Sequence, residues 1–181
     1  AEDGVIKFAF ISRIMKEKGI DQYLEAAEVI REKHRDTIEF HVCGFCEPEY
    51  NGKLQKMHDK GVVNYHGMIR DVTDFIGEMH CIIHPTYYPE GISNVLLEAC
   101  ATGRPIITTD RSGCREVVED GVNGYMIPCQ DAKALIEAIE MFLSLSWEQK
   151  KRLGMSARKT VEERFDRQIV VQKYVEEVNR A

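Results

Sequence analysis

The stretch CIIHPTYYPEGISNVLLEACATGRPIIT, residues 81–108, decides the fold. It opens with a short apolar run that ends at Pro85, passes through a loop into a helical stretch over 94–102, and turns at Gly103. A second β-type run begins at Pro105, and proline is tolerated at the first position of a strand. A strand, a helix and a strand in this order form a right-handed crossover between parallel strands. The stretch therefore predicts an α/β domain.

The same alternation continues on both sides of this unit. Further strands are expected at 5–11, 38–43, 62–65 and 124–127, and further helices at 20–30, 53–60, 71–77, 134–142, 147–164 and 167–178. No repeat or linker interrupts the pattern, so residues 1–181 are expected to form one Rossmann-like, three-layer domain with a parallel sheet of about six strands. Ligands of such sheets bind beyond the carboxyl ends of the strands.

Composition narrows the class of partner and the compartment. The chain of 181 residues has a net charge of −6, which argues against nucleic acid, since that partner calls for a basic face. No run is long and apolar enough to cross a bilayer, and no signal peptide precedes the first strand. Because the chain starts at Ala1 and enters a strand at once, we expect a domain cut from a longer cytoplasmic protein.

The six cysteines favour a reducing environment over a disulfide framework. Cys43 and Cys46 form a C-x-x-C, which is compatible with a redox pair or half of a zinc site. No second C-x-x-C or spaced histidine pair completes a zinc site. The histidines are expected to be structural or solvated, except that His84, close before the loop that contains Glu90, lines the expected pocket.

The helix expected after Ser93 suits an anionic ligand. Its apolar residues leave almost no polar face, so a buried helix is expected, with Asn94 as its cap and Glu98 inside it. The free amides of its first turn suit a diphosphate, and the Glu98 carboxylate suits the two hydroxyls of a ribose. Gly91 lets the backbone approach a ligand, and Glu90 is placed to take sugar hydroxyls. Alternatively, Glu98 is a core acid paired with a cation and Glu90 a solvated charge.

Glu90 and Glu98 form an E-x7-E that resembles the hallmark of glycosyltransferase family 4, among the glycosyl transferases of group 1. The resemblance continues in ATGRPIITTD at 101–110, GCREVVEDGVNGYMIP at 113–128, SRIMKEKGI at 12–20 and ARKTVEERF at 157–165. It covers nearly the whole chain in the right order. It implies the C-terminal, donor-binding half of a two-domain GT-B glycosyltransferase, whose N-terminal acceptor domain is not in this chain.

The resemblance also implies a role for each matching residue. Glu90 contacts the donor sugar and Glu98 the nucleotide ribose, while Arg13 and Lys18 clamp the diphosphate, so that Arg13, Lys18 and Glu90 are the catalytic candidates. The donor-binding backbone is expected at Gly91, Ile92, Ser93, Asn94 and Val95, with Gly44, Met68 and Ile69 further around the donor pocket. Two cations at the end of a strand can offset the charge of a leaving diphosphate.

The implied reaction moves a sugar from a nucleoside-diphosphate sugar to a polysaccharide or lipid-linked oligosaccharide acceptor, with retention at the anomeric carbon. A UDP-sugar is favoured over a GDP-sugar. No D-x-D is present, and GT-B enzymes need no metal, so no cofactor is expected. The fragment should bind donor without turning it over, and the full-length enzyme is expected at the inner face of the cytoplasmic membrane. The alternatives are a non-catalytic nucleotide-sugar-binding module and a GT-B-shaped sugar-nucleotide epimerase.

Two further expectations concern the second half of the chain. Arg115 and Glu116 lie in a loop that, by the resemblance, faces the donor cleft, where Glu116 is expected to cap a helix or to pair. The C-terminal helices, about 147–181, are expected to pack on the domain or toward the absent one. Their last apolar stripe, which comprises Ile169, Val170, Tyr174 and Val178, is expected to be core, with part of it exposed where the other domain is missing.

Overall fold

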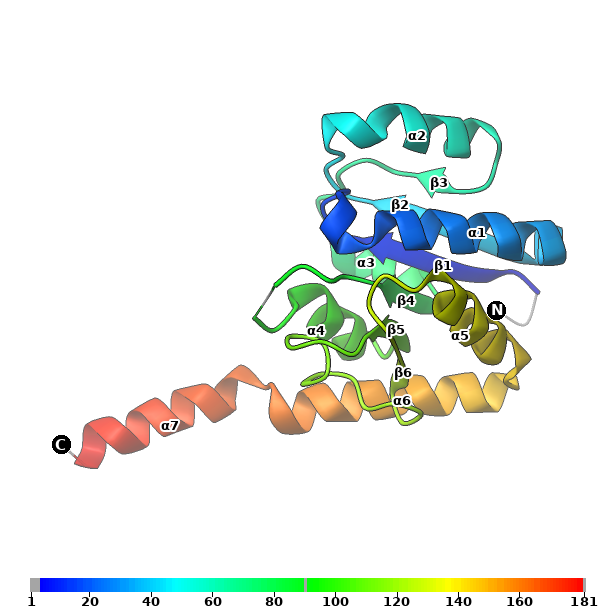
Figure 1. Ribbon diagram of the computed structural model, residues 1–181. Coiled ribbons are helices and arrows are strands. Elements are labelled where there is room, and N and C mark those ends of the chain that lie inside the picture. The colour runs from blue at the N-terminus through cyan, green and yellow to red at the C-terminus, as the bar shows by residue number, and fades with distance from the viewer. Residues whose placement is uncertain (1–3, 90, 181) are drawn as a thin grey trace.

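A computed structural model describes residues 4–89 and 91–180, and its centre is one parallel sheet of six strands in the order β3-β2-β1-β4-β5-β6 (Figure 1). The strands are β1 (Ile6–Ile11), β2 (Ile38–Cys43), β3 (Asn64–Tyr65), β4 (Cys81–His84), β5 (Ile106–Thr109) and β6 (Gly124–Ile127). Every pair is parallel, so all carboxyl ends lie at one edge, called here the carboxyl edge, and all amino ends at the other, the amino edge. The predicted α/β class and six-strand sheet are confirmed.

Helices cover both faces of the sheet. The seven α-helices found among the described residues are α1 (Ile20–His34), α2 (Pro48–Asp59), α3 (Val72–Glu78), α4 (Asn94–Ala101), α5 (Ala132–Ser144), α6 (Trp147–Arg164) and α7 (Arg167–Arg180). Buried residues of α1, α2 and α5 form a core with one face of the sheet. Those of α3, α4 and α6 form a second core with the other face. The result is the predicted three-layer arrangement.

The first core is built around aromatic rings. Phe8 of β1 stacks on Phe40 of β2 with their centroids 5.3 Å apart, and Tyr23 of α1 meets Phe40 edge-on at 5.7 Å. The buried Tyr23 hydroxyl donates to the His41 carbonyl at 2.8 Å, which satisfies the one polar atom of that ring. Burial raises the pKa of Tyr23 well above its ordinary value, so its hydroxyl stays protonated as a donor.

The sequence patterns did not predict two short 3₁₀ helices or the true start of α2. The 3₁₀ helix η1 (Lys16–Lys18) precedes α1, and η2 (Arg35–Thr37) follows it. The helix expected at 53–60 begins instead at Pro48, since proline is well suited to the first turn. The spacing of its buried residues Tyr50, Leu54 and Met57 would have indicated that start.

The structure corrects the prediction that α4 is buried on all sides. Leu96, Ala99 and Cys100 are buried, but Asn94 and Glu98 are exposed on the opposite face, one turn apart. The N-cap position belongs to Ser93, not to Asn94, and the Ser93 side chain makes no capping bond. Glu98 is therefore accessible from solvent and is not a core acid.

The structure also corrects the prediction for the last apolar stripe. No residue of α7 is buried over its whole length, Arg167–Arg180, and Tyr174 is 71% exposed. In Figure 1, α7 continues from α6 past the carboxyl edge and away from the sheet. Its apolar side chains contribute nothing to the core of this domain.

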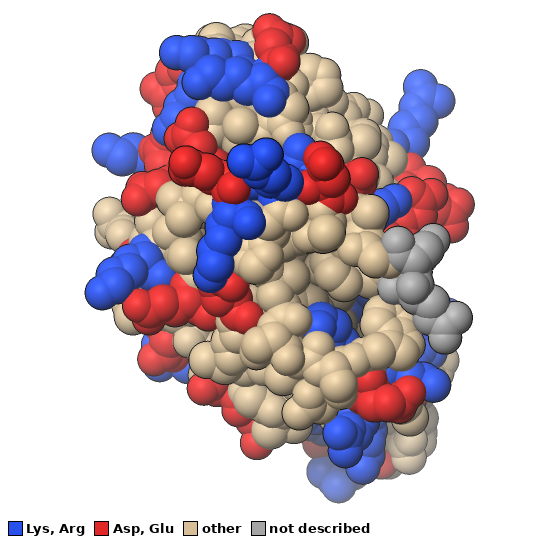
Figure 2. All heavy atoms as spheres, turned by 90° about the vertical axis from the view of Figure 1, so that its right-hand side faces the viewer, with Lys and Arg blue, Asp and Glu red and all other residues tan. Residues whose placement is uncertain are grey.

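The surface seen from the amino edge shows no large basic face among the described residues, as expected from the net charge of −6. Figure 2 looks onto the amino edge, and acidic and basic side chains are interspersed over it. In the part of the chain that the structure describes, no helix is long and apolar enough to span a membrane, and no group of three or more His, Cys, Asp or Glu side chains is placed to hold a metal ion. None of the six cysteines, which lie within that part, forms a disulfide.

Candidate functional site

The carboxyl edge has a switch point between β1 and β4. These two strands are neighbours, yet the helices that follow them, α1 and α4, pack on opposite faces of the sheet. The loops after β1 and β4 therefore diverge, and in open α/β sheets the crevice between such loops is where ligands bind. The residues of these two loops define the candidate site.

Backbone contacts tie the two loops together. The amide of Tyr87 donates to the carbonyl of Glu17 at 2.8 Å, and the Thr86 hydroxyl donates to the same oxygen at 3.3 Å. Gly19, with φ +80°, lies so close to Pro85 that an added Cβ would be 2.1 Å from its carbonyl oxygen. Only glycine fits there, so η1 is held against the loop that leads into α4.

Lys18 and Arg13 both lie on the loop after β1, but in different surroundings. The half-buried Lys18 has its Nζ 4.8 Å from the ring centroid of Tyr88, which places the ammonium over the loop between β4 and α4. Arg13 has a side chain that is 62% exposed and a loose ion pair with Glu47 at 3.7 Å. Such an exposed pair contributes little to stability. The Arg13 guanidinium is therefore available to an anionic ligand at little cost.

The start of α4 offers fewer amides than the sequence suggests. The Ser93 amide donates to the Gly113 carbonyl at 3.2 Å, and its buried hydroxyl lies 3.3 Å from Nε2 of His84. Ser93 thus positions the helix, and its amide is already engaged within the protein, so its predicted contact with a donor stays a prediction. Asn94 and Val95 form the first turn, and no described residue accepts a hydrogen bond from their amides. Together with the helix dipole, these amides suit an anion.

Of the two acids of the E-x7-E, Glu98 lies among the described residues. Glu98 lies one turn into α4, exposed on the face that Asn94 shares. Glu90 lies outside the described residues, so its predicted sugar contacts stay a prediction. Gly91 and Ile92, which follow it, are exposed ahead of the helix. The accessible face of α4 thus presents Asn94 and Glu98 beside the loop that carries Gly91 and Ile92.

Gly44, Met68 and Ile69 lie on the other side of the switch point. The Gly44 amide donates to the Gly67 carbonyl at 2.8 Å, which joins the loops after β2 and β3. At φ +140°, an added Cβ on Gly44 would be 1.8 Å from the Ser12 carbonyl oxygen. Met68 is 76% exposed and Ile69 is half-buried. These residues form a tight backbone platform with one exposed apolar side chain, a suitable surface for a planar base.

The loop after β5 supports α4 indirectly. The Glu116 carboxylate accepts from the Gly113 amide at 2.6 Å and from the Ser112 hydroxyl at 3.3 Å. Although burial raises it, the pKa of Glu116 is lowered overall by the backbone hydrogen bonds and the Ser112 hydroxyl. Since Gly113 in turn accepts from Ser93, Glu116 is a positioning residue, as its predicted pairing role implied. Arg115 pairs with Asp110 instead, at 3.1 Å.

Sequence reasoning missed Tyr88 and misplaced His84. Tyr88 faces the ammonium of Lys18, and the pair of tyrosines before Pro89 was the available signal. His84 was expected to line the pocket, whereas it is 2% exposed and lies against Ser93. It belongs to the support of α4, not to its accessible face.

Known proteins similar to this chain in sequence include a glycosyltransferase and a spore coat protein. It is 30% identical over 168 residues to the capsular polysaccharide biosynthesis glycosyltransferase CapM of Staphylococcus aureus, a match that covers 89% of this chain and 42% of that protein. It is 31% identical over 173 residues to spore coat protein SA of Bacillus subtilis, covering 90% of this chain and 46% of that protein. The chain thus spans less than half the length of these relatives.

Solved structures share the fold. HepE of Anabaena in complex with UDP superposes with a TM-score of 0.84 at 19% identity, over 98% of this chain and 50% of that one. The C-terminal domain of the group 1 glycosyl transferase LpcC from Francisella tularensis superposes with a TM-score of 0.77 at 19% identity, over 89% of this chain and 86% of that one. The α/β fold is the one found in GT-B glycosyltransferases.

The family described as Glycosyl transferases group 1 matches residues 1–160, a range that contains every strand of the sheet, both loops of the switch point and α4. This chain belongs to that family.

Proposed function

We propose that this chain is the C-terminal, donor-binding domain of a retaining family 4 glycosyltransferase, and that its carboxyl edge binds a nucleoside-diphosphate sugar. The observation that carries the proposal is the juxtaposition at the switch point. There, Lys18 from the loop after β1 lies over the loop that leads into α4, whose first-turn amides point to the same edge. A cation and a helix N-terminus together suit a diphosphate.

The proposed chemistry is electrostatic. As the bond between the sugar and the diphosphate breaks, negative charge develops on the diphosphate. Lys18, Arg13 and the amides of Asn94 and Val95 stabilise that charge. Glu98 holds the ribose by accepting hydrogen bonds from its hydroxyls. Glu90 orients the donor sugar, and the platform of Gly44, Met68 and Ile69 receives the base.

The second half of the proposed enzyme lies outside this chain. A chain that spans less than half of its relatives and that matches a C-terminal domain of a group 1 glycosyl transferase over 86% of that domain supports the assignment to the C-terminal half. The acceptor site belongs to the N-terminal domain. Closure of the two halves excludes water during transfer, so this chain alone binds the donor without turning it over.

We favour a UDP-sugar as donor and a polysaccharide or lipid-linked oligosaccharide as acceptor. Supporting this choice, one structural neighbour contains UDP-glucose, and relatives include an N-acetylgalactosaminyltransferase that acts on an undecaprenol-linked sugar in Campylobacter jejuni. A lipid-linked acceptor places the whole enzyme at the inner face of the cytoplasmic membrane. The transfer uses no metal, so a chelator should leave the activity of the full-length enzyme unchanged.

Calorimetric titration with UDP, GDP and ADP tests the proposal. UDP should bind, and Lys18→Ala and Glu98→Ala should each weaken it roughly tenfold or more, the loss expected for a hydrogen bond to a charged group. Lys16→Ala, on the same 3₁₀ helix, and Glu28→Ala, on the exposed side of α1, are the matched controls and should bind UDP normally. Equal losses in the site variants and their controls, or no binding of any nucleotide at millimolar concentration, would argue against a donor site at this edge.

A further inference from the structure

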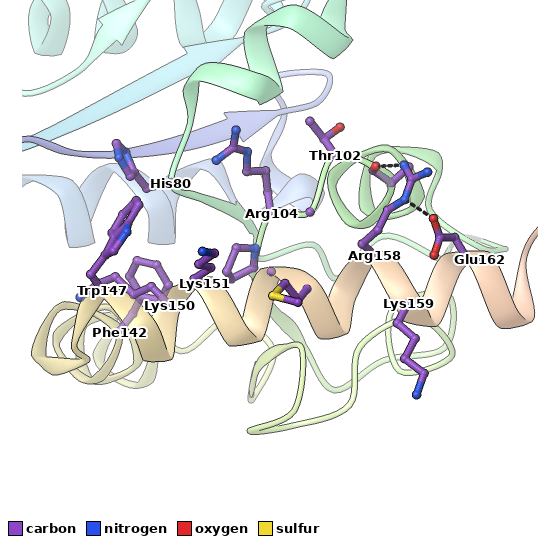
Figure 3. Close-up of a pocket in the computed structure, with 15 residues that line it drawn as sticks. His80, Thr102, Arg104, Phe142, Trp147, Lys150, Lys151, Arg158, Lys159 and Glu162 are labelled. Carbon is purple, nitrogen blue, oxygen red and sulfur yellow. Dashed lines mark hydrogen bonds and ion pairs between the residues drawn. The ribbon is translucent and has the colours of Figure 1, made fainter. Parts of the chain in front are cut away.

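A pocket lies at the amino edge, at the other end of the strands from the proposed donor site. It has a volume of about 520 Å³ and is formed where α6 passes the amino ends of β4 and β5 (Figure 3). The name amino-edge pocket is used here for the cavity lined by His80, Arg104, Trp147, Lys151, Met155 and Arg158, among others. None of these residues takes part in the site described above.

Two glycines open this pocket by bringing α6 close to the turn before β5. An added Cβ on Gly154 of α6 would be 2.2 Å from the carbonyl oxygen of Gly103, which itself has φ +68°. The helix backbone therefore forms part of the pocket floor. Larger side chains of α6 on either side of Gly154 form its walls.

One wall of the pocket is apolar and aromatic. Trp147 is 46% exposed, and its ring meets His80 at a centroid distance of 6.1 Å in an edge-on arrangement. Met155, 64% exposed, lies two turns further along α6. Exposed tryptophan and methionine beside a cavity are suited to an apolar group of a ligand.

Some charged side chains of the pocket already bond to other protein groups or extend away from the pocket. Lys150 donates to the carbonyls of Leu143 and Leu145, so it caps the end of α5 and is not available to a ligand. Arg158 donates to Glu162 at 2.6 Å and to the Ala101 carbonyl. In Figure 3, Lys159 extends away from the other labelled residues.

Arg104 and Lys151 retain donors that the protein does not use. The Arg104 guanidinium donates to the Gly77 carbonyl, but its buried Nε has no hydrogen-bond partner among the described residues. A buried donor without a partner is costly and is usually satisfied by water or a ligand. Lys151 is exposed, and neither a hydrogen bond nor an ion pair links it to any residue that the structure describes.

We propose that the amino-edge pocket binds a phosphate group attached to an apolar moiety, with the phosphate between Arg104 and Lys151 and the apolar part against Trp147 and Met155. Two available positive charges match the charge of a phosphate monoester, and a guanidinium paired with an ammonium is suited to phosphate. Helix α6 carries six Lys or Arg residues against three Glu in a chain with a net charge of −6, so this helix is where an anion is attracted.

The single tryptophan of the chain gives a direct measurement, because Trp147 lines the pocket. Its fluorescence should change in a saturable way on titration with phenyl phosphate, more weakly with inorganic phosphate, and independently of saturating UDP. Vesicles of phosphatidylcholine with an equal part of phosphatidylglycerol, compared with phosphatidylcholine alone, distinguish a lipid headgroup from a free phosphorylated compound as the source of the phosphate.

Charge-removing variants locate the site. Lys151→Gln should weaken binding of the responding probe by roughly tenfold, the effect of losing one charge-assisted hydrogen bond. Lys60→Gln, exposed between α2 and the outermost strand β3 and not among the residues that line the pocket, is the matched control and should bind normally. Arg104→Gln should weaken binding as well, but because it also removes the bond to Gly77, the exposed Lys151 variant carries the test.

Three results would overturn the proposal. One is the absence of a saturable fluorescence change with either phenyl phosphate or the anionic vesicles. Another is an equal loss of affinity in Lys151→Gln and Lys60→Gln. The third is competition by UDP, which would place the phosphate in the nucleotide site. Since the probe site and the donor site are titrated separately, failure here is distinguishable from failure of the proposed function.

Discussion

Gly19 is a residue at which the loop after β1 packs tightly against the loop after β4. Its φ of +80° and the 2.1 Å that would separate an added Cβ from the Pro85 oxygen leave no room for a side chain. Gly19→Ala should therefore destabilise the fold in two ways. The alanine would be strained at this φ, and its Cβ would clash with the Pro85 carbonyl, so that the backbone at Pro85 would have to move. The substitution should also weaken UDP binding, because Lys18 is the preceding residue.

Gly61 provides the control for this prediction, since it has φ +68° but open space around an added Cβ. Gly61→Ala should cost about 1–2 kcal/mol of unfolding free energy, the usual cost of a left-handed alanine. Gly19→Ala should cost about 1–3 kcal/mol more, as overpacking does. Urea denaturation measures both variants, and equal losses would show that the Pro85 contact is unimportant.

The lowered pKa values of His41 and His66 should make the free energy of unfolding depend on pH. Nδ1 of His41 is 2.9 Å from Nε2 of His66, and the rings stack. Burial lowers the pKa of both below the ordinary 6.5; for His41, Glu39 partly opposes the shift. The unfolded chain therefore takes up protons first as the pH falls. The stability that these histidines contribute is complete above 6.5 and is lost as the pH drops through their lower folded values.

Unfolding free energies measured between pH about 7 and about 5 test this, because carboxylates titrate lower. The decrease should be smaller in His41→Gln/His66→Gln than in the unaltered chain. A decrease of the same size in both would assign the pH dependence to other groups.

At the residue scale, the place of the two cations along the chain was easier to predict than the engagement of the helix amides. Arg13 and Lys18 lie in the loop after β1, which ends at Ile11, while their contacts with a diphosphate stay a prediction that comes from the family resemblance. The engagement of the Ser93 amide could not, because its acceptor, Gly113, is twenty residues away in a loop. The exposure of Glu98 could have been predicted, because Asn94 and Glu98 are polar residues one turn apart. The many apolar residues around them led instead to the prediction of a buried helix.

Helix α7 is the element least attached to this domain. None of its residues, Arg167–Arg180, is buried, although six large apolar side chains lie along it. Deletion of residues 167–181 should change the unfolding free energy of this chain by no more than about 0.5 kcal/mol, as expected for a surface change. Thermal or urea denaturation of the shortened chain measures this, and a loss of several kcal/mol would show that α7 packs on the domain in solution.

The boundaries of regular elements were predictable where one pattern prevailed. Strands β2, β4 and β6 and helix α6 lie where the apolar periodicity put them. The start of α2 at Pro48 and the 3₁₀ helix η1 were missed, because a polar surface helix and a three-residue turn carry weak periodicity. The stripe on α7 has the periodicity of a core helix, yet periodicity does not say which surface covers it.

At the scale of the whole molecule, the two ends of the sheet have different proposed tasks. The carboxyl edge collects the loops of the switch point, while the amino edge holds the pocket between α6 and the starts of β4 and β5. The sequence predicts a parallel sheet but not the order of its strands. Phe8 of β1 pairs with Cys81 of β4, 73 residues further along, and no local pattern encodes that contact. The amino-edge pocket could not be predicted from the sequence, because it depends on the tertiary packing of Gly154 against Gly103.

The central claim is that a nucleotide binds at the carboxyl edge, and amide chemical shifts of the isotope-labelled chain titrated with UDP test it most directly. We predict saturable shifts that cluster at Gly44, Met68, Asn94 and Val95, with the amides of α6 around Lys151 unchanged. Shifts that cluster instead around Trp147 and Lys151, or that scatter without saturation, would contradict a donor site at the switch point.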